Sequence, residues 1–374
     1  MPDESVSSWL DRELALNPRV EGPAARHYRT RDGPMVHPDI RPRSLWVDQV
    51  AAIFGIEPSD ISKATLSSHY SGLQARYISW MNDPYDHPAD VSRKSHRTDV
   101  SIKWCSRCLS EDMNRGLPGY IRRDWLLSVQ TFCPKHAWPL QGRCSKCRRG
   151  CYSPEFRRTP WTGPYCGGCG HPLTRAKSNA LRAEPSGLAS WKAIVAFENS
   201  VKDIVVAKPD RAAARGRAAR QAFLAVYGDL FEILVGLDYR ENRKLRGIDF
   251  FETLALPFER VHVSNFATNC HPMMVTAPSL ALRLSATIGA LLEPAGILPQ
   301  LLFQRSRAEL LGHLRWLYDT GPRSRLMMRR DRWPAEFVAS LDAATPQKTL
   351  DFQLWDAAGM IDALQRYRRT GQIA

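Results

Sequence analysis

The sequence predicts a mainly α-helical protein with a small zinc-binding module in the first half of the chain. Apolar residues recur at helical spacing on both sides of this module, and no β-rich region or internal repeat stands out. Eight of the nine cysteines fall between Cys105 and Cys169. We therefore expect three domains: an N-terminal helical region over residues 1–95, a double zinc-finger module over residues 96–175 and a helical C-terminal domain over residues 176–374. A length of 374 residues suits two or three domains.

The composition is that of a basic globular protein. Hydrophobic residues make up 44% and charged residues 24%, which excludes a wholly disordered chain. There are 52 Lys or Arg and 38 Asp or Glu, so the net charge is +14. This excess favours a polyanionic partner, most often nucleic acid, over a soluble protein that is merely basic.

Neither a secretory signal nor a membrane span is expected. The acidic start, Met1-Pro2-Asp3-Glu4, lacks the positive and apolar regions of a signal peptide. The most apolar stretch, Leu284 to Phe303, is interrupted by Glu293, Pro294 and Pro299, whereas a spanning helix needs about 20 mostly apolar residues. We interpret this stretch as two buried helical pieces with a break, and we expect a cytoplasmic protein without membrane contact.

The cysteines come in close pairs that are typical of zinc knuckles. The pairs are Cys105 with Cys108, Cys133 with His136, Cys144 with Cys147, and Cys166 with Cys169. Two residues separate the ligands of each pair, so both can point at one metal, and two pairs supply the four ligands of a tetrahedral Zn²⁺. Pairing in sequence order gives a first site of Cys105, Cys108, Cys133 and His136 and a second site of Cys144, Cys147, Cys166 and Cys169. Interleaved pairing, as in RING domains, is the alternative, and Cys151 is interpreted as a buried thiol beside the second site.

Both sites are expected to hold structural zinc, because a catalytic zinc keeps an open position for water and each site here has four protein ligands. The H-x-E that precedes P-C-x-x-C in zinc deaminases is missing. No P-loop, G-x-S-x-G or H-E-x-x-H motif is present. The sequence therefore predicts a protein that is not an enzyme and that binds two Zn²⁺.

The zinc module is also strongly basic. From Cys105 to Arg175, twelve Lys or Arg stand against four Asp or Glu. The candidate nucleic-acid contacts are Arg122, Arg123, Arg148, Arg149, Arg157 and Arg158. Aromatic residues such as Trp125 and Trp161 are interleaved with them, and aromatic rings can stack on bases while basic side chains contact phosphates. The alternative is that the aromatic residues form the module's core and the basic residues its solvated surface.

Two helical segments are predicted before the zinc module. Ser5 is a candidate N-cap for a short helix that ends at Asn17-Pro18. Residues 44–66 suggest a helix-turn-helix, because Ala51, Gly55 and Ile61 stand where that motif needs a small residue, a turn glycine and a buried aliphatic residue. A DNA-reading motif would turn Ser62, Lys63 and Thr65 toward a groove. An ordinary helical hairpin or a protein-binding module remains open as the alternative.

Several of these segments resemble the TniQ/TnsD family of transposon target-selection proteins. The resemblance lies in the start, Glu4-Ser5-Val6-Ser7-Ser8-Trp9-Leu10, in Trp104-Cys105-Ser106-Arg107-Cys108-Leu109, and in the block Phe132-Cys133-Pro134-Lys135-His136-Ala137-Trp138-Pro139-Leu140 that is followed by Cys144-Ser145-Lys146-Cys147. It is specific over residues 1–175 and diffuse beyond, and the length is closer to a compact TniQ than to a long TnsD.

The resemblance implies a non-enzymatic targeting adaptor in the bacterial cytoplasm, associated with the nucleoid. Such a protein links a target-recognition device to the AAA+ transposition ATPase (TnsC/TniB-like) that recruits the transposase. The device is the protein's own contact with target DNA, a resolution site, or a CRISPR effector complex with its guide RNA, and several relatives act as homodimers. Trp9 and Leu10, on the short first helix, either anchor the ATPase or pack on the chain's own core.

A second class of function is a stand-alone zinc-containing transcriptional regulator that binds DNA sequence-specifically. In that case the N-terminal helices and the zinc module read an operator. A neighbouring transposase and ATPase gene would favour the adaptor, and a CRISPR array beside them would favour RNA-guided targeting.

Overall fold

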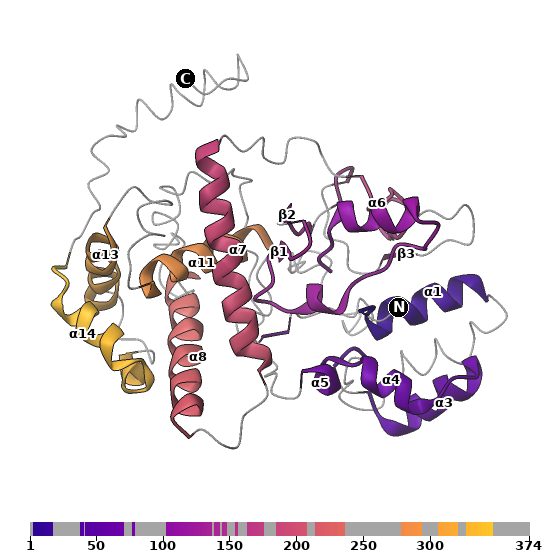
Figure 1. Ribbon diagram of the computed structural model, residues 1–374, viewed down its shortest axis with the longest axis horizontal. Coiled ribbons are helices and arrows are strands. Elements are labelled where there is room, and N and C mark those ends of the chain that lie inside the picture. The colour runs from indigo at the N-terminus through magenta and orange to yellow at the C-terminus, as the bar shows by residue number, and fades with distance from the viewer. Residues whose placement is uncertain are drawn as a thin grey trace, which may run out of the picture.

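The protein is mainly helical, as the sequence predicts (Figure 1). The computed structural model describes residues 3–17, 38–40, 42–70, 77–78, 102–136, 138–142, 144–147, 154–155, 163–175, 185–207, 214–235, 278–293, 306–320 and 327–346. The strands of these residues form two short antiparallel pairs, and both lie in the region of the cysteines. The first pair joins β1 (Phe132–Cys133) to β2 (Trp138–Pro139), and the second joins β3 (Pro154–Glu155) to β4 (Tyr165–Cys166).

The N-terminal helices form a small apolar core of their own. Helix α1 (Val6–Leu16) begins at Ser5, whose hydroxyl accepts a hydrogen bond from the Ser8 amide at 3.2 Å, as the N-cap prediction requires. Its apolar side packs on α3 (Ser44–Phe54) and α4 (Pro58–Ala64). The buried residues of this core are Val6, Leu10, Val47, Val50, Ala51 and Ile61.

The turn between α3 and α4 follows the predicted pattern in part. Gly55 ends α3 with a φ of 64°, a left-handed conformation that glycine adopts without strain, and Ala51 and Ile61 are buried. However, α4 (Pro58–Ala64) has only seven residues. Thr65, expected to face a DNA groove, is buried and donates its hydroxyl to the Ser62 carbonyl at 2.8 Å. The pair of helices is therefore present, but a DNA-reading helix-turn-helix is not confirmed.

Hydrogen bonds connect the segment before α1 to the cysteine region. The Ser5 amide donates to the Ile121 carbonyl at 3.0 Å, and the Ile121 amide donates to the Ser8 hydroxyl at 3.0 Å. The Arg123 amide donates to the Asp3 carbonyl at 2.8 Å. Residues more than 110 positions apart thus share one backbone hydrogen-bond network, which fixes α1 against the cysteine region.

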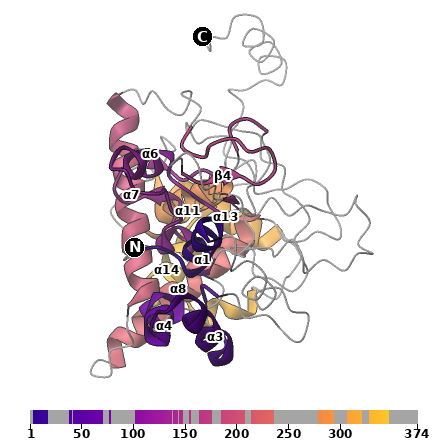
Figure 2. The same ribbon diagram turned by 90° about the vertical axis from the view of Figure 1, so that its right-hand side faces the viewer.

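The C-terminal part is a bundle of helices that covers one side of the cysteine region. Its helices are α7 (Pro185–Val206), α8 (Ala214–Val235), α11 (Pro278–Leu292), α13 (Arg307–Thr320) and α14 (Ala335–Ala343). Figure 1 shows α7 between the other C-terminal helices and the elements that carry the cysteines, and Figure 2 shows it along one edge of the molecule. Lys202 of α7 forms an ion pair with Asp124 of the 3-10 helix η3 (Arg123–Leu126), so α7 contacts the cysteine region directly.

One continuous core joins the cysteine region to the C-terminal helices. It contains ligand residues such as Cys105 and Cys133 together with Leu230 of α8 and Leu284 of α11. The first piece of the apolar stretch after Leu284 is buried as expected, whereas most of its second piece lies outside the described residues. Among the described helices, none is both long and apolar enough to cross a membrane. The domain boundaries at 95/96 and 175/176 stay predictions.

Candidate metal centres

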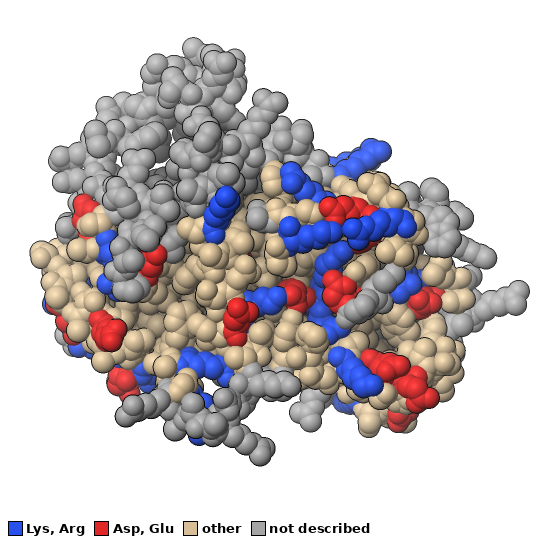
Figure 3. Space-filling model, in the orientation of Figure 1, with Lys and Arg blue, Asp and Glu red and all other residues tan. Residues whose placement is uncertain are grey.

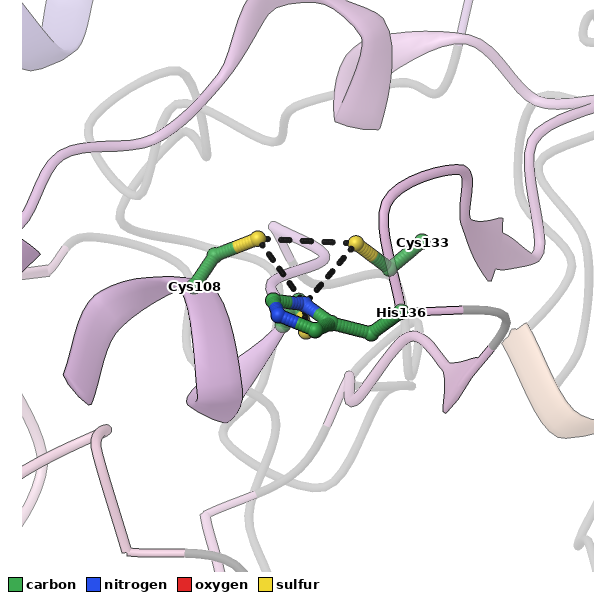
Figure 4. A group of neighbouring side chains, drawn as sticks. Cys108, Cys133 and His136 are labelled. Carbon is green, nitrogen blue, oxygen red and sulfur yellow. Dashed lines mark hydrogen bonds between the residues drawn. The ribbon is translucent and has the colours of Figure 1, made fainter. Parts of the chain in front are cut away.

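The first cluster consists of Cys105, Cys108, Cys133 and His136, supplied by one helix and one hairpin. Cys105 is the N-cap of α6 (Ser106–Asn114), and Cys108 lies in its first turn. Cys133 ends β1, and His136 lies in the turn that leads to β2. The helix start and the hairpin turn therefore aim two ligands each at a common point, and Figure 4 shows Cys108, Cys133 and His136 converging on it.

The separations in the first cluster fit a tetrahedral metal ion. The His136 Nδ1 atom lies 3.4, 3.3 and 3.5 Å from the sulfurs of Cys105, Cys108 and Cys133, and the Cys108 and Cys133 sulfurs are 3.5 Å apart. Zinc bonds are about 2.3 Å long to sulfur and about 2.0 Å long to nitrogen. At tetrahedral angles, these bonds place a nitrogen about 3.6 Å from a sulfur and two sulfurs about 3.8 Å from each other. The donor set and its spacing are therefore those of a closed zinc site with His136 bound through Nδ1.

A carboxylate outside the cluster fixes the orientation of the histidine ring. The His136 Nε2 atom lies 2.7 Å from Oε1 of Glu111, which also forms an ion pair with Lys135. Hydrogen bonds from Lys135 and His136 lower the pKa of Glu111 below its ordinary value. An ionised Glu111 accepts a hydrogen bond from Nε2–H and leaves Nδ1 with the lone pair that can bind a metal, the arrangement by which proteins set the tautomer of a metal-bound histidine.

Two buried charged residues hold the chain that leads into β1. Glu198 of α7 is 1% exposed and accepts hydrogen bonds from the amides of Thr131 and Phe132, at 3.0 and 3.2 Å, and from the Thr131 hydroxyl. Lys103 is 4% exposed and donates to the carbonyls of Leu127 and Gln130. These contacts fix the segment just before Cys133, so a residue of the C-terminal bundle positions a ligand of the first cluster.

Burial shifts the pKa values of Glu198 and Lys103 toward pH 7. Loss of hydration raises the pKa of Glu198 from 4.5 to about 7, although the hydrogen bonds from Thr131 oppose the rise. The same cause lowers the pKa of Lys103 from 10.5 to about 7, against the attraction of Glu198.

The second cluster consists of Cys144, Cys147, Cys166 and Cys169, supplied by two turns and the end of β4. The sulfurs of Cys144 and Cys169 are 3.6 Å apart, and those of Cys147 and Cys166 are 3.8 Å apart, close to the tetrahedral edge of about 3.8 Å for zinc. Gly170, with a φ of 64°, follows the last ligand, and its amide donates to the Cys166 carbonyl at 2.7 Å. Cys144 and Cys166 are buried, whereas Cys147 and Cys169 are half-buried.

The structure groups the ligands in sequence order rather than in the interleaved order. In each group all four ligand atoms lie within 4.8 Å of one another. The seven described cysteines are free thiols rather than disulfides. Both groups are therefore compatible with a metal ion, and four protein ligands in each leave no position for a substrate.

The structure shows Arg122 and Arg123, two of the predicted nucleic-acid contacts, engaged within the chain. Arg122 binds both carboxylate oxygens of Asp112, at 2.9 and 3.1 Å, and its guanidinium lies over the rings of Tyr120 and Trp125. Arg123 is only 5% exposed. These contacts support a structural role for both arginines, and their contact with nucleic acid stays a prediction.

The remaining candidate contacts in the module cannot be placed. Arg148, Arg149, Arg157 and Arg158 lie outside the described residues, as do Cys151 and Cys270.

Trp9 and Leu10 pack on the chain's own core, which was the alternative to a partner contact. Leu10 is 1% exposed, and the Trp9 ring meets Phe54 edge-to-face with centroids 5.2 Å apart. The Leu10 side chain is enclosed by α3 and α4, and its contact with a partner stays a prediction. Trp9 is half-buried in the same core.

Sequence reasoning missed Glu111, Lys103 and Glu198. A signal existed for Glu111, because a carboxylate one turn after Cys108 on a helix lies near the ligands. For Glu198 the signal was a charge on the buried face of α7 that also carries Ile194 and Val201. No sequence pattern links Glu198 to Thr131, which lies 67 positions away.

The fold and the clusters define a mainly helical protein that is built around two closed Cys/His centres. Residues 1–140 match the family model of TniQ, which confirms the resemblance over that part of the chain. The match includes α1, the N-terminal helices and the whole first cluster, and it ends before Cys144. No curated protein matches the chain. A TniQ domain fits a role associated with transposition.

Proposed function

We propose that this protein is a non-enzymatic targeting adaptor that links a target-DNA recognition complex to an AAA+ ATPase regulator, which in turn recruits a transposase. The observation that carries the proposal is the TniQ match over residues 1–140. Two closed four-ligand clusters support it, because they suit a scaffold that presents surfaces to other macromolecules rather than a reaction centre.

Zinc is the metal that we assign to both clusters. Thiolate and imidazole donors at tetrahedral spacing suit Zn²⁺, which supplies cross-links between chain segments and no chemistry of its own here. In the first cluster such a cross-link joins α6 to the β1–β2 hairpin, against which α7 packs.

The recognition complex either contains target DNA alone or is a CRISPR effector with its guide RNA. The net charge of +14 supports a nucleic-acid neighbour in both cases. A homodimer would place two such adaptors on one target. Gene neighbourhood separates the two kinds of complex, because only the RNA-guided form needs a CRISPR array.

The proposal is tested by reconstituting transposition with and without this protein. We expect purified protein to bind the ATPase directly, and we expect its omission to abolish integration at the chosen target while the ATPase and the transposase stay active. Integration with an unchanged rate and target distribution in its absence would contradict the adaptor role.

The second candidate is a sequence-specific DNA-binding regulator. It is favoured by the α3–α4 pair with its left-handed Gly55, and by Lys63, whose side chain is 75% exposed on α4. Nuclease footprinting on the DNA upstream of its own gene tests this function. Protection of one site at nanomolar protein, without any ATPase, would favour the regulator.

A further inference from the structure

A basic residue stands immediately before the second ligand in three of the four ligand pairs. Arg107 precedes Cys108, Lys135 precedes His136, and Lys146 precedes Cys147. All three side chains are exposed, as is Arg175, which follows the last ligand pair. We call these four residues the basic surface.

Side-chain and backbone contacts join these four residues across both clusters. The Arg107 guanidinium lies 4.3 Å from the ring centroid of Trp138 in β2, and Glu111 of α6 pairs with Lys135. The Ser110 hydroxyl of α6 donates to the Thr174 carbonyl at 3.3 Å. The Ser145 hydroxyl donates to the Arg175 carbonyl at 3.0 Å, which brings the Lys146 loop to the same place.

The arrangement places α6 between the hairpin of the first cluster and the loops of the second cluster. Figure 3 shows Lys and Arg side chains gathered, with fewer acidic ones, over the region where Figure 1 places α6. Contacts through α6 and through the loops beside the ligands thus connect the residues of the basic surface to both clusters.

The chemistry of this surface suits phosphates better than it suits another protein. The basic surface has four cationic side chains and, beside them, the partly exposed carboxylate of Glu111. Among the described large hydrophobic residues that are exposed, only Leu117 belongs to residues 96–175, whereas protein interfaces bury an apolar centre. We propose that the basic surface contacts the phosphate backbone of double-stranded DNA. The choice of nucleic acid rests on the proposed function, which the inference deepens by naming the surface.

The competing role for these cations is to neutralise the thiolate charge of the metal clusters. Their contacts argue against it. Arg107 is held over Trp138 and Lys135 is held by Glu111, while the sulfurs of Cys105, Cys108 and Cys133 are at most 1% exposed. Arg107 and Lys135 thus lie at the surface and contact an aromatic ring and a carboxylate rather than sulfur.

The test compares two variants of the full chain that lose the same charge. One carries R107Q, K135Q, K146Q and R175Q. The control carries R43Q, K192Q, R217Q and R332Q, whose wild-type side chains are exposed beside α3, on α7, on α8 and at the end of the 3-10 helix η4 (Met327–Arg332). Binding to a random-sequence DNA duplex is measured by fluorescence anisotropy over a range of salt concentrations. Circular dichroism checks that both variants are folded, and metal analysis checks that both hold their metal ions.

We expect the first variant to lose about 3 to 4 units from the slope of log affinity against log salt, since each phosphate contact contributes about 0.9 on B-DNA. The control should lose less than half of that. Paired variants, R107Q with K135Q and K146Q with R175Q, should each lose about 2 units, so the test survives if the fourfold variant does not fold.

Equal losses in the first variant and the control would overturn the proposal, because binding would then depend on diffuse charge. Loss of metal with unchanged DNA binding would assign the cations to thiolate neutralisation. Displacement of DNA by polyglutamate of equal charge concentration would indicate an acidic protein partner instead. Binding of the first variant to the ATPase is measured in parallel, so failure of this surface and failure of the adaptor role give different results.

Discussion

The two metal-ligand clusters have the same number of ligands but differ in what holds them. The first is framed by α6 and the β1–β2 hairpin, its histidine is held by Glu111, and the chain leading into it is held by Glu198 of α7. The second is framed mainly by turns, and two of its cysteines are half-buried. The TniQ match includes the first cluster and stops before the second.

This difference indicates that the first cluster is coupled more directly to the C-terminal helices than the second. Cysteines of both clusters belong to the core that continues into α7, α8 and α11, and the first is also joined to α7 by the hydrogen bonds of Glu198 with Thr131 and Phe132. Removing the first metal should therefore affect distant helices, and removing the second should mainly affect nearby chain.

The largest expected effect is the contrast between Cys108→Ser and Cys169→Ser. Structural zinc is coupled to folding and contributes on the order of 10 kcal/mol, so Cys108→Ser should unfold the cysteine region and lower the total helicity. Cys169→Ser should lose one metal per chain and keep most of its helicity. Thermal melting by circular dichroism, together with metal analysis, measures both, and equal loss of structure in the two variants would remove the distinction.

A smaller effect is expected at Glu198, whose pKa is raised to about 7 by burial. The folded protein keeps a proton on Glu198 that the unfolded chain releases above about pH 4.5, so this group's contribution to stability falls as the pH rises through 7. The stability of wild type relative to Glu198→Gln should therefore fall by about 2 kcal/mol between about pH 5.5 and 7.5.

Denaturant unfolding of the metal-loaded proteins measures this difference. Ser200→Ala, on the exposed side of the same helix, is the control and should follow the wild-type pH profile. A wild-type advantage that rises over this range would mean that Glu198 is held ionised in the fold.

A more local effect, of a size similar to that at Glu198, is expected for Glu111→Ala, which removes the hydrogen-bond partner of His136. Loss of such a partner weakens metal binding by a factor of about 10 to 100, and here only the first cluster should be affected. Competition with a chromophoric chelator measures the affinity of each cluster, with Glu336→Gln on the exposed part of α14 as the control. Equal weakening of both clusters would show that Glu111 does not act through His136.

The sequence was sufficient for features that depend on neighbours along the chain. The ligand pairs, the Ser5 cap and the left-handed Gly55 each follow from a few adjacent residues. The sequence favoured the sequential grouping of the pairs and left the interleaved one open. The structure decides between them by placing Cys108 beside Cys133, 25 positions away.

The sequence was insufficient where distant segments decide the role of a side chain. Arg122 was predicted to bind nucleic acid because it is basic, yet Asp3 and Asp112 approach it from two other segments and enclose it. Leu10 was open to two interpretations until α3 and α4 were seen to cover it. Glu198 belongs to the first cluster only through the packing of α7, which no local pattern specifies.

The most direct test of the different roles of the two clusters is stepwise removal of metal from the cobalt-substituted protein. Cobalt bound by three thiolates and an imidazole absorbs differently from cobalt bound by four thiolates, so each cluster can be followed separately while circular dichroism reports helicity. We predict two metals per chain, release from the half-buried second cluster first with little change in helicity, and then release from the first cluster together with a large loss of helicity. Release of the first cluster's metal with the helices intact would contradict the account.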